Sequence, residues 1–264
     1  SAARRHPAQS ASMPIRLRLA FAALVALWWL AVAMLPAGAH AADVVVIDQA
    51  LAQPAADGDR PPEFGADAQA VSLPDDWADS RPRYEGGVWY SVSFDRPAGA
   101  DRQELMALYV ERVCSNLEVW LNGQRIFSGG RMNEPVTRNC HYPQLVALPG
   151  ALLNDRGNVL ELLVQGHAQQ RVASRLRAGG LSALKIGPHG ALAPEQARQR
   201  FWNVTVVEVV SVVLATMGLL MIGLGLANRR EAYLSYFGWL SLTWGLLSMR
   251  LWWRDLPWDN GVME

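Results

Sequence analysis

The chain has 264 residues, 51% of them apolar and 18% charged, and its 24 basic and 24 acidic side chains cancel. Nucleic-acid-binding proteins usually carry a basic excess, so this balance argues against a nucleic-acid partner. The length allows one or two domains with a core of their own. Charge is unevenly distributed, because residues 43–200 read like a soluble domain whereas residues 204–249 hold few charged side chains.

The first apolar segment is typical of a secretory signal. Two arginines precede an uncharged run from Leu19 to Leu35, and Ala39-His40-Ala41 fits a small-x-small cleavage site. We therefore predict a signal peptide at 13–41, with residues 1–12 lying upstream of the natural start and expected to be disordered. An uncleaved anchor is the alternative, because the apolar run is slightly longer than a usual signal core. In both versions the domain that comes next in the chain is exported.

Export also bears on the two cysteines, Cys114 and Cys140. In an oxidising compartment a lone pair of cysteines in one domain favours a disulfide, which would stabilise the domain by roughly 3 kcal/mol. Two separate thiols, one buried and one in a loop, are the alternative. A zinc site would need more ligands than these cysteines and His141, so no metal or other cofactor is predicted.

Residues 42–187 are expected to form an exported all-β sandwich. Short apolar runs alternate with turns rich in Gly, Pro and Asp, and no helical period is present. Asn122-Gly123 lies between two strand-like runs and is the strongest local signal for a β-hairpin. The first predicted strand begins at Val44. Four more are predicted at 87–94, 105–113, 158–166 and 181–187.

An ordered series of motifs in this region resembles the jelly-roll, galactose-binding-like domain of family-two glycoside hydrolases. The motifs are LPDDW (73–77), YEGGVWYSVSF (84–94), LEVWLNGQRIFSGG (117–130) and LPGALLNDRGNVLELLVQG (148–166). The resemblance implies a fold and not a reaction, because the catalytic carboxylates of that family lie in a separate barrel. No catalytic residue is therefore assigned.

Aromatic residues supply the candidates for ligand binding. Trp77 and Tyr84 lie in loop-like sequence and could offer ring faces to a carbohydrate or another small molecule. Trp89 and Trp120 lie inside predicted strands, where core packing is the ordinary role of an aromatic ring. The adjacent acids Asp75-Asp76 are expected to be turn residues and not a catalytic pair.

Two membrane-spanning helices are predicted, at 204–227 and 232–251. The uncharged or nearly uncharged runs in them have 23 and 18 residues, or roughly 35 and 27 Å of helix against a hydrocarbon layer of roughly 30 Å. A buried helical pair of a soluble protein is the alternative, but it would need a large surrounding protein. Residues 188–203 are expected to form a stiff, partly helical connector from Pro194.

Charges and indole rings predict the orientation of this hairpin. Arg229 and Arg230 occupy the tight loop, and such loops are enriched in Lys and Arg on the cytoplasmic side. Trp202 would then lie at the outer interface, together with Trp252, Trp253 and Trp258. The prediction is a bacterial inner-membrane protein with its β domain and residues 252–264 in the periplasm.

Few side chains within the predicted spans suggest a specific role. Glu208 is the one charged side chain within the apolar runs 204–226 and 232–249, and intramembrane carboxylates are functional candidates. It lies fewer than two helical turns from Trp202, so solvation at the interface is the alternative. Gly218, Gly223 and Gly225 are small enough to allow close helix packing, although they do not form a Gly-x-x-x-Gly motif.

The order of signal, β domain, connector and membrane hairpin resembles the bacterial seven-transmembrane receptors with diverse intracellular signalling modules. The run RREAYLSYFGWLSLTWGLLSMR (229–250) is similar to the first cytoplasmic loop and second helix of that family. The resemblance implies a sensor with a histidine kinase output, or alternatively a diguanylate cyclase. Two spans return the chain to the outside, so we expect these residues to be the front portion of a longer receptor with no enzyme activity of their own.

The expected partners are membrane lipid and an external small molecule, with carbohydrate as the class that the resemblance implies. Homodimerisation through the membrane helices is left open. Two other classes of function are weighed: a membrane-anchored carbohydrate-binding module without signalling, and a transporter component. The first would need only one span, and the second usually needs several polar residues deep in its spans.

Overall fold

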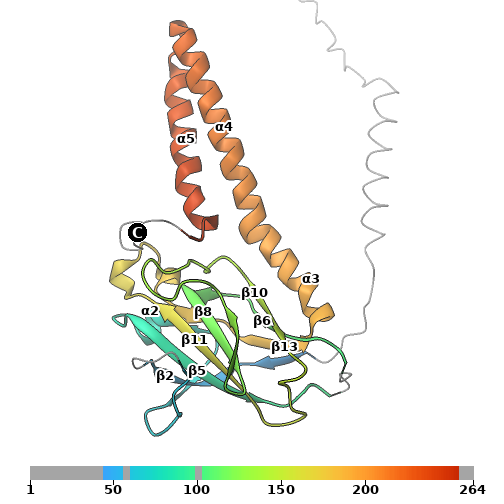
Figure 1. The fold of residues 1–264 in the computed structure, drawn as a ribbon. Helices are drawn as coiled ribbons and strands as arrows, with labels where there is room; N and C mark the ends of the chain where they lie inside the picture. Colours follow the sequence, from blue (N-terminus) through green and yellow to red (C-terminus); the bar gives the residue numbers. More distant parts are fainter. Residues whose placement is uncertain (1–43, 56–59, 99–102, 256–264) are drawn as a thin grey trace, which may run out of the picture. The chain divides into compact units, whose positions relative to one another are not determined.

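The computed structural model describes residues 44–55, 60–98 and 103–255, all within one compact unit that extends from Ala42 to Glu264. The predicted signal peptide at 13–41, the upstream residues 1–12 and the predicted interfacial residue Trp258 lie outside the described residues. The described part consists of antiparallel sheets followed by a helical hairpin (Figure 1).

Three sheets form the described part of the β domain, and all their strand pairs are antiparallel. The first sheet has the order β1 (Val45–Ile47), β13 (Leu184–Pro188), β6 (Met106–Val110) and β10 (Gln144–Leu148). The second has the order β3 (Gln69–Ser72), β2 (Gln49–Pro54), β5 (Gly86–Phe94), β11 (Asn158–Gly166), β8 (Asn116–Leu121) and β9 (Gln124–Ser128). The small third sheet joins β4 (Asp75–Asp76), β12 (Gly180–Leu181) and β7 (Val113–Cys114).

One hydrophobic core is shared by the two larger sheets. Strand β11 alternates strictly between buried and half-buried residues, which is the period of a strand with only one face in a core. Its buried Leu160, Leu162 and Val164 join one cluster with Leu108 of β6 and Ile186 of β13. The two sheets therefore pack face to face, and the described domain is mostly β structure, as predicted.

The predicted hairpin at Asn122-Gly123 is confirmed. It joins β8 to β9, and both central residues have positive φ values, 50° and 78°, which a tight two-residue hairpin turn requires. The Asn122 side chain holds the turn in place, because Oδ1 accepts from the backbone N of Val159 at 2.8 Å and Nδ2 donates to the carbonyl of Leu152 at 2.7 Å.

A long helical segment comes after the last strand. Helix α3 (His189–Arg200) continues through a π-helical turn, η3 (Phe201–Thr205), into α4 (Val206–Ala227). The connector helix begins before the expected Pro194, because its first turn is held by the β domain. The backbone N of His189 donates to the carbonyl of Leu105 at 2.8 Å, and Leu192 packs against the β6 residues Ala107 and Tyr109.

The chain then reverses and returns beside α4. A short 3-10 turn, η4 (Arg229–Glu231), contains both arginines of the predicted cytoplasmic loop and is capped by the Asn228 side chain. Helix α5 (Tyr233–Trp252) comes next and pairs with α4. Figure 1 shows this pair, with α4 in orange and α5 in red.

Small side chains line the contact between α4 and α5. Ser211, Gly218 and Gly225 are buried on α4 at intervals of seven residues, and Gly238 and Gly245 are buried on α5 at the same interval. A Cβ on Gly238 would lie 2.7 Å from the carbonyl oxygen of Gly218, so the backbones approach as closely as glycine allows.

Gly223 was expected to take part in this packing, and that expectation is wrong. A Cβ built on Gly223 meets nothing within 4 Å, because this residue lies two positions from Gly225 and so faces away from α5.

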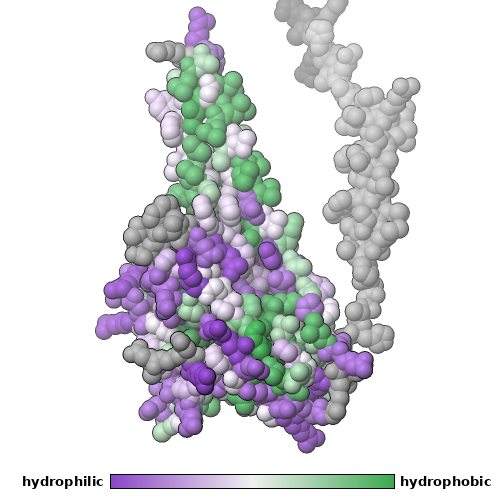
Figure 2. Space-filling model, in the orientation of Figure 1, coloured by the Kyte–Doolittle hydropathy of each residue, from purple (hydrophilic) through white to green (hydrophobic). Residues whose placement is uncertain are grey.

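One described helix, His189–Ala227, is long and apolar enough to cross a membrane, and its most apolar 18-residue window has a mean hydropathy of 2.4. Only 17% of that window is buried, and hydrophobic side chains cover much of the visible hairpin (Figure 2). Helix α5 has the length of a span, but it contains Arg250 and many Tyr, Trp, Ser and Thr residues, which lower its mean hydropathy. The composition therefore supports one spanning helix, and the second remains a proposal.

Candidate functional site

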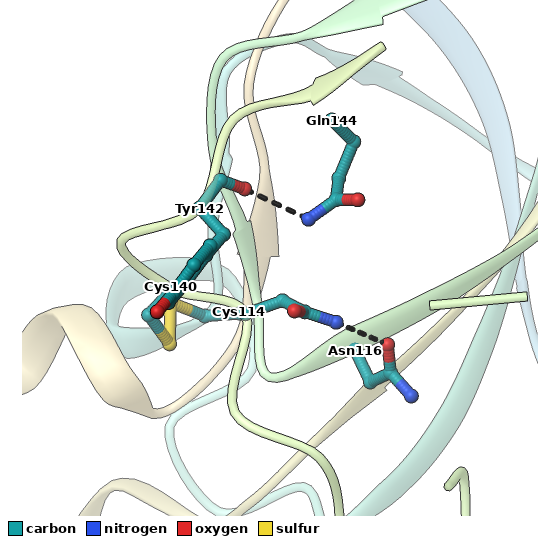
Figure 3. Close-up of a disulfide and its surroundings, with 6 residues drawn as sticks. Cys114, Asn116, Cys140, Tyr142 and Gln144 are labelled. Carbon is teal, nitrogen blue, oxygen red and sulfur yellow. Dashed lines mark hydrogen bonds between the residues drawn. A yellow bond between two sulfur atoms is a disulfide. The ribbon is translucent and has the colours of Figure 1, made fainter. Parts of the chain in front are cut away.

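The loop between β9 and β10 (residues 129–143, the β9–β10 loop) is fixed to the β domain by a disulfide and by buried amides. Cys114 of β7 is bonded to Cys140 of the loop, with an S–S distance of 2.05 Å. Asn139 is fully buried and donates to Asn116 Oδ1 at 2.6 Å and to the carbonyl of Gly129 at 3.0 Å. Figure 3 shows the disulfide and the bond to Asn116. The β9–β10 loop is thus anchored at its start, Gly129, and in its last third, at Asn139 and Cys140.

The same loop also holds the C-terminal end of α5. The backbone N of Arg138 donates to the carbonyl of Arg254 at 3.1 Å, and the Tyr142 hydroxyl donates to the carbonyl of Trp252. Thr137 Oγ1 donates to the Asp255 carboxylate at 2.6 Å. The α5 end is therefore bonded to the β domain through several groups.

The other end of the hairpin is attached through α3. Leu192 is buried against the four-stranded sheet, and Lys185 of β13 pairs with Glu195 of α3 at 2.6 Å. Since α3 is continuous with α4, the β domain contacts the hairpin at two separate places.

A cavity of about 480 Å³ lies between these two attachments. Its walls come from the β6–β7 connection, the disulfide, the segment before β12, the C-terminal part of α3 with η3, and the last turn of α5. A smaller cavity of about 60 Å³ shares the lining residues Cys140, His141, Arg177, Arg250 and Leu251. Both cavities thus meet beside the disulfide.

The larger cavity carries more positive than negative charge. Arg112, Arg177 and Arg250 line it, whereas Glu111 is the single acidic side chain among the described residues that line it. Glu111 accepts a bond from Gln199 Nε2 at 3.4 Å. Within the described residues, no carboxylate lies within ion-pair distance of Arg112 or Arg250.

The pKa of His141 is affected by these positive charges. Burial lowers the pKa of its imidazole below the ordinary 6.5, and the charges of Arg177, Arg138 and Arg112 lower the pKa further. A histidine in such surroundings is neutral near pH 7 and can donate or accept one hydrogen bond at each ring nitrogen.

Among the described residues, the smaller cavity is lined by four arginines and two glutamates, so it also carries more positive than negative charge. Glu85 pairs with Arg171 at 2.7 Å, and the Glu134 carboxylate lies 3.6 Å from His167 Nδ1. No group of three or more His, Cys, Asp or Glu side chains among the described residues could hold a metal ion.

Trp77 was a candidate for ligand binding, and the structure places it in the core instead. Its side chain has 0% exposure, and its Nε1 donates to the Tyr90 hydroxyl at 2.7 Å. Tyr90 in turn donates to Asp75 at 2.6 Å, and Arg81 pairs with the same carboxylate oxygen at 2.6 Å. An external ligand cannot reach a ring that is covered in this way, so this assignment is wrong.

Tyr84, the second candidate, is half-buried beside Trp77. The two rings meet edge to face with centroids 5.7 Å apart, and the Tyr84 hydroxyl donates to the carbonyl of Gly87 at 2.7 Å. The hydroxyl is engaged within the domain, and Tyr84 lines neither of the two cavities beside the disulfide.

Two other aromatic residues were expected in the core, and both are buried but on the other face of their sheet. Trp89 is 1% and Trp120 9% exposed, and their rings meet edge to face with centroids 6.3 Å apart. They alternate with the core residues Val88 and Tyr90 on β5 and Val119 and Leu121 on β8, so they cover the outer face of the six-stranded sheet.

Glu208 lies in the first turn of α4, at the end of the hairpin that is nearer the β domain. Burial raises the pKa of the Tyr142 phenol, Arg254 and Arg200 oppose that rise, and Glu208 adds to it. Glu208 is therefore close enough to the β9–β10 loop to act on Tyr142.

No protein-family model matches the chain, and no curated protein matches it. Solved structures that it resembles are glycoside hydrolases. A Faecalibacterium prausnitzii beta-glucuronidase has 17% identity and a TM-score of 0.42 over 58% of this chain and 33% of its own. A glycosyl hydrolase family 2 member from Bacteroides cellulosilyticus has 14% identity and a TM-score of 0.40 over 55% and 20%.

A Bifidobacterium dentium beta-glucuronidase has 15% identity and a TM-score of 0.42 over 57% of this chain and 31% of its own. The chain thus spans about a third or less of the length of these proteins. TM-scores of 0.40 to 0.42 at such low identity carry no conclusion about what this chain binds or catalyses.

The arginines of the cavity were not singled out by sequence. Arg112, Arg177 and Arg250 are far apart in the chain, and no local pattern around them indicates a shared site. One local signal was present, because the segment QRVASRLR (170–177) carries three positive charges and no negative one.

Proposed function

We propose that this chain is the sensory and first membrane portion of a bacterial signal-transduction receptor. Its β domain, a jelly-roll of the galactose-binding-like type, faces the periplasm, and its hairpin crosses the inner membrane. The output is a histidine kinase, with a diguanylate cyclase as the alternative. A membrane-anchored carbohydrate-binding module is the competing non-signalling function.

The observation that carries this proposal is the double attachment of the hairpin. Helix α3 packs on the four-stranded sheet through Leu192, and the α5 end is bonded to the β9–β10 loop through Tyr142 and Thr137. An anchor that only tethers a domain needs one attachment. With two attachments, a conformational change in the β domain moves the C-terminal end of α5 relative to α3, which continues into α4.

A ligand can drive such a change only if it binds two states of the receptor with different affinity. A molecule in the 480 Å³ cavity would contact the β domain, the end of α3 and the end of α5 together, so its affinity depends on their relative placement. Glycines bring α4 and α5 into close contact, and a small sliding motion between packed helices is a common form of conformational change.

The orientation is tested by labelling single cysteines with a membrane-impermeant maleimide. Both native cysteines are bonded to each other, so an introduced cysteine is the single free thiol. Arg230→Cys in the bend should stay unlabelled in intact spheroplasts and react after permeabilisation. Ser128→Cys, at an exposed site of β9, should react in both. Efficient labelling of Arg230→Cys in intact spheroplasts rejects the proposed topology.

Signalling is tested in the complete receptor. Deleting the β domain should abolish ligand-dependent output, and unchanged output would reject the sensory role. Tyr142→Phe removes the bond from the β9–β10 loop to α5 and should weaken output while ligand still binds. Tyr236→Phe, whose side chain is exposed on α5, is the matched control and should leave output as it is.

A further inference from the structure

We propose that the 480 Å³ cavity binds an oxyanion, the carboxylate or phosphate group of a small molecule, between Arg112 of the β domain and Arg250 of α5. The proposal rests on the receptor function above and names the chemical class of its ligand. It differs from the binding of a neutral sugar on an aromatic platform, which the buried position of Trp77 excludes at that residue.

The two arginines are placed as ligand-binding residues and not as structural ones. Arg112 and Arg250 are both half-buried, both line the cavity, and no described carboxylate lies within ion-pair distance of either. A half-buried guanidinium without such an acidic partner has lost part of its hydration and has gained no ion pair in return. An anion between them would supply that partner, with the paired bonds that guanidinium groups form to carboxylate and phosphate.

The rest of the lining does not cancel this charge. Arg177, only 7% exposed, also lines the cavity. The acidic lining residue Glu111 is exposed, so solvent screens its single negative charge. Burial and the neighbouring arginines lower the pKa of His141, which favours the neutral imidazole, and the N–H of a neutral imidazole can donate a hydrogen bond to an anion.

The size of the cavity sets the size of the ligand. A volume of about 480 Å³ falls in the range of roughly 300–1,000 Å³ that is usual for small-molecule sites. A sugar acid or a phosphorylated monosaccharide fits this volume. The phosphate of a lipid headgroup has the same chemistry, and the cavity lies at the C-terminal end of the proposed spanning helix α5. The experiment therefore has to separate a soluble ligand from a lipid.

The position of the site also links binding to signalling. Arg112 belongs to the β domain, and Arg250 belongs to the last turn of α5, so one anion would be shared by two parts that the proposed receptor must move together. The anion binds more tightly to a receptor conformation in which the two guanidinium groups are closer together. Because its affinity differs between the two conformations, its binding shifts the equilibrium between them.

The test measures binding to the purified chain in a neutral detergent by titration calorimetry. The probes are glucuronate, inorganic phosphate and, as the uncharged control of similar size, glucose. We expect glucuronate or phosphate to bind and glucose not to bind. Arg112→Gln and Arg250→Gln should each weaken anion binding about ten-fold or more, because each removes a charge-assisted pair.

Arg125→Gln is the matched control. Arg125 of β9 is exposed, pairs with Glu118 of β8 and does not line the cavity. The substitution removes the same charge and should leave the affinity unchanged. A melting curve for each variant shows whether the fold is kept. If Arg250→Gln does not fold, Arg250→Lys supplies the second measurement, since it retains the charge but loses the forked geometry and should weaken binding less than Arg112→Gln.

A second arm separates solute from lipid. The chain is placed in nanodiscs of phosphatidylcholine alone or with phosphatidylglycerol, and co-purifying lipid is measured. Retention of phosphatidylglycerol that falls in Arg112→Gln and Arg250→Gln supports the site with a lipid phosphate as ligand. Binding of glucuronate or free phosphate with the same dependence supports the site with a soluble ligand. Equal binding of glucose and glucuronate, anion binding that survives both variants, or no anion binding in either arm overturns the proposal.

These outcomes are independent of signalling. If the chain binds anions through Arg112 and Arg250 but the complete receptor has no ligand-dependent output, the receptor function is rejected. The proposed anion site is then still supported. If ligand-dependent output is present and neither Arg112→Gln nor Arg250→Gln changes it, the anion site is rejected. The receptor function is then still supported.

Discussion

The bonded series Trp77–Tyr90–Asp75 gives the sharpest test of how the β domain is held together. Tyr90→Phe removes a single oxygen from the core. That oxygen accepts from Trp77 Nε1 at 2.7 Å and donates to Asp75 at 2.6 Å, and the Tyr90 and Trp77 side chains have 0% exposure. The substitution therefore leaves a buried indole N–H without a partner.

The expected cost is set by these contacts. An unsatisfied buried donor costs about 1–3 kcal/mol, and a hydrogen bond to a carboxylate contributes about 1.5–3 kcal/mol. Asp75 keeps its ion pair with Arg81 at 2.6 Å, so only part of the second amount is lost. We expect a total loss of about 2–4 kcal/mol, which for a domain of this size lowers the melting temperature by roughly 4–16 °C.

Thermal unfolding of the purified chain in detergent, followed by near-ultraviolet circular dichroism, measures this loss. Tyr84→Phe removes one bond to a backbone carbonyl at a half-buried site and should cost about 1 kcal/mol. Tyr236→Phe, on an exposed side chain of α5, should melt within about 2 °C of the parent chain. A Tyr90→Phe variant that melts as close to the parent as Tyr236→Phe would refute the reasoning.

Three further predictions concern the hairpin, the disulfide and the pH dependence. Gly238→Val should lower the melting temperature of the helical signal, because its Cβ would lie 2.7 Å from a carbonyl oxygen of α4, whereas Gly223→Val meets nothing within 4 Å and should not. Replacing Cys114 and Cys140 together by Ala should lower the free energy of unfolding in urea by about 3 kcal/mol, because the bridge closes a loop with a sequence separation of 26. The pKa of His141 is lowered from 6.5, chiefly by burial, so the unfolded chain takes up this proton first as the pH falls. The free energy of unfolding should therefore decrease from about pH 6.5 down to the lower pKa of the folded state and then level off, and His141→Gln should remove that part of the decrease.

Each of these has a result that would contradict it. Equal melting of the two glycine variants would mean that the helices do not cross as closely as described. Unchanged stability after loss of the disulfide would mean that the unfolded chain is not restricted by it. A pH dependence that His141→Gln leaves intact would belong to other groups.

Several features could be predicted because they depend on neighbouring residues alone. The Asn122-Gly123 turn needs positive φ at adjacent positions, and Asn and Gly adopt such angles at low cost whatever surrounds them. The apolar run that forms α4 is contiguous, so its length and hydropathy can be read directly. The alternation in β11 likewise repeats every two residues and predicts a strand with one buried face.

The misassigned Trp77 shows where this local reasoning ends. It comes after two acidic residues in what reads as a loop, yet Gly166 and Gly179 from distant segments come so close that a Cβ on either would lie 2.3–2.4 Å from its ring. Glycines more than eighty residues away therefore make room for the indole. No pattern around Trp77 contains that information.

The sequence by itself determined a β domain and an apolar helix, because strand alternation, turn chemistry and hydropathy act over a few consecutive residues. Only the tertiary structure decided which aromatic rings are covered, which glycines meet across the hairpin, and that Arg112 and Arg250 line one cavity. These features depend on contacts between segments that are far apart in the chain. Such contacts form only when the sheets, the disulfide and the two helix ends are brought together.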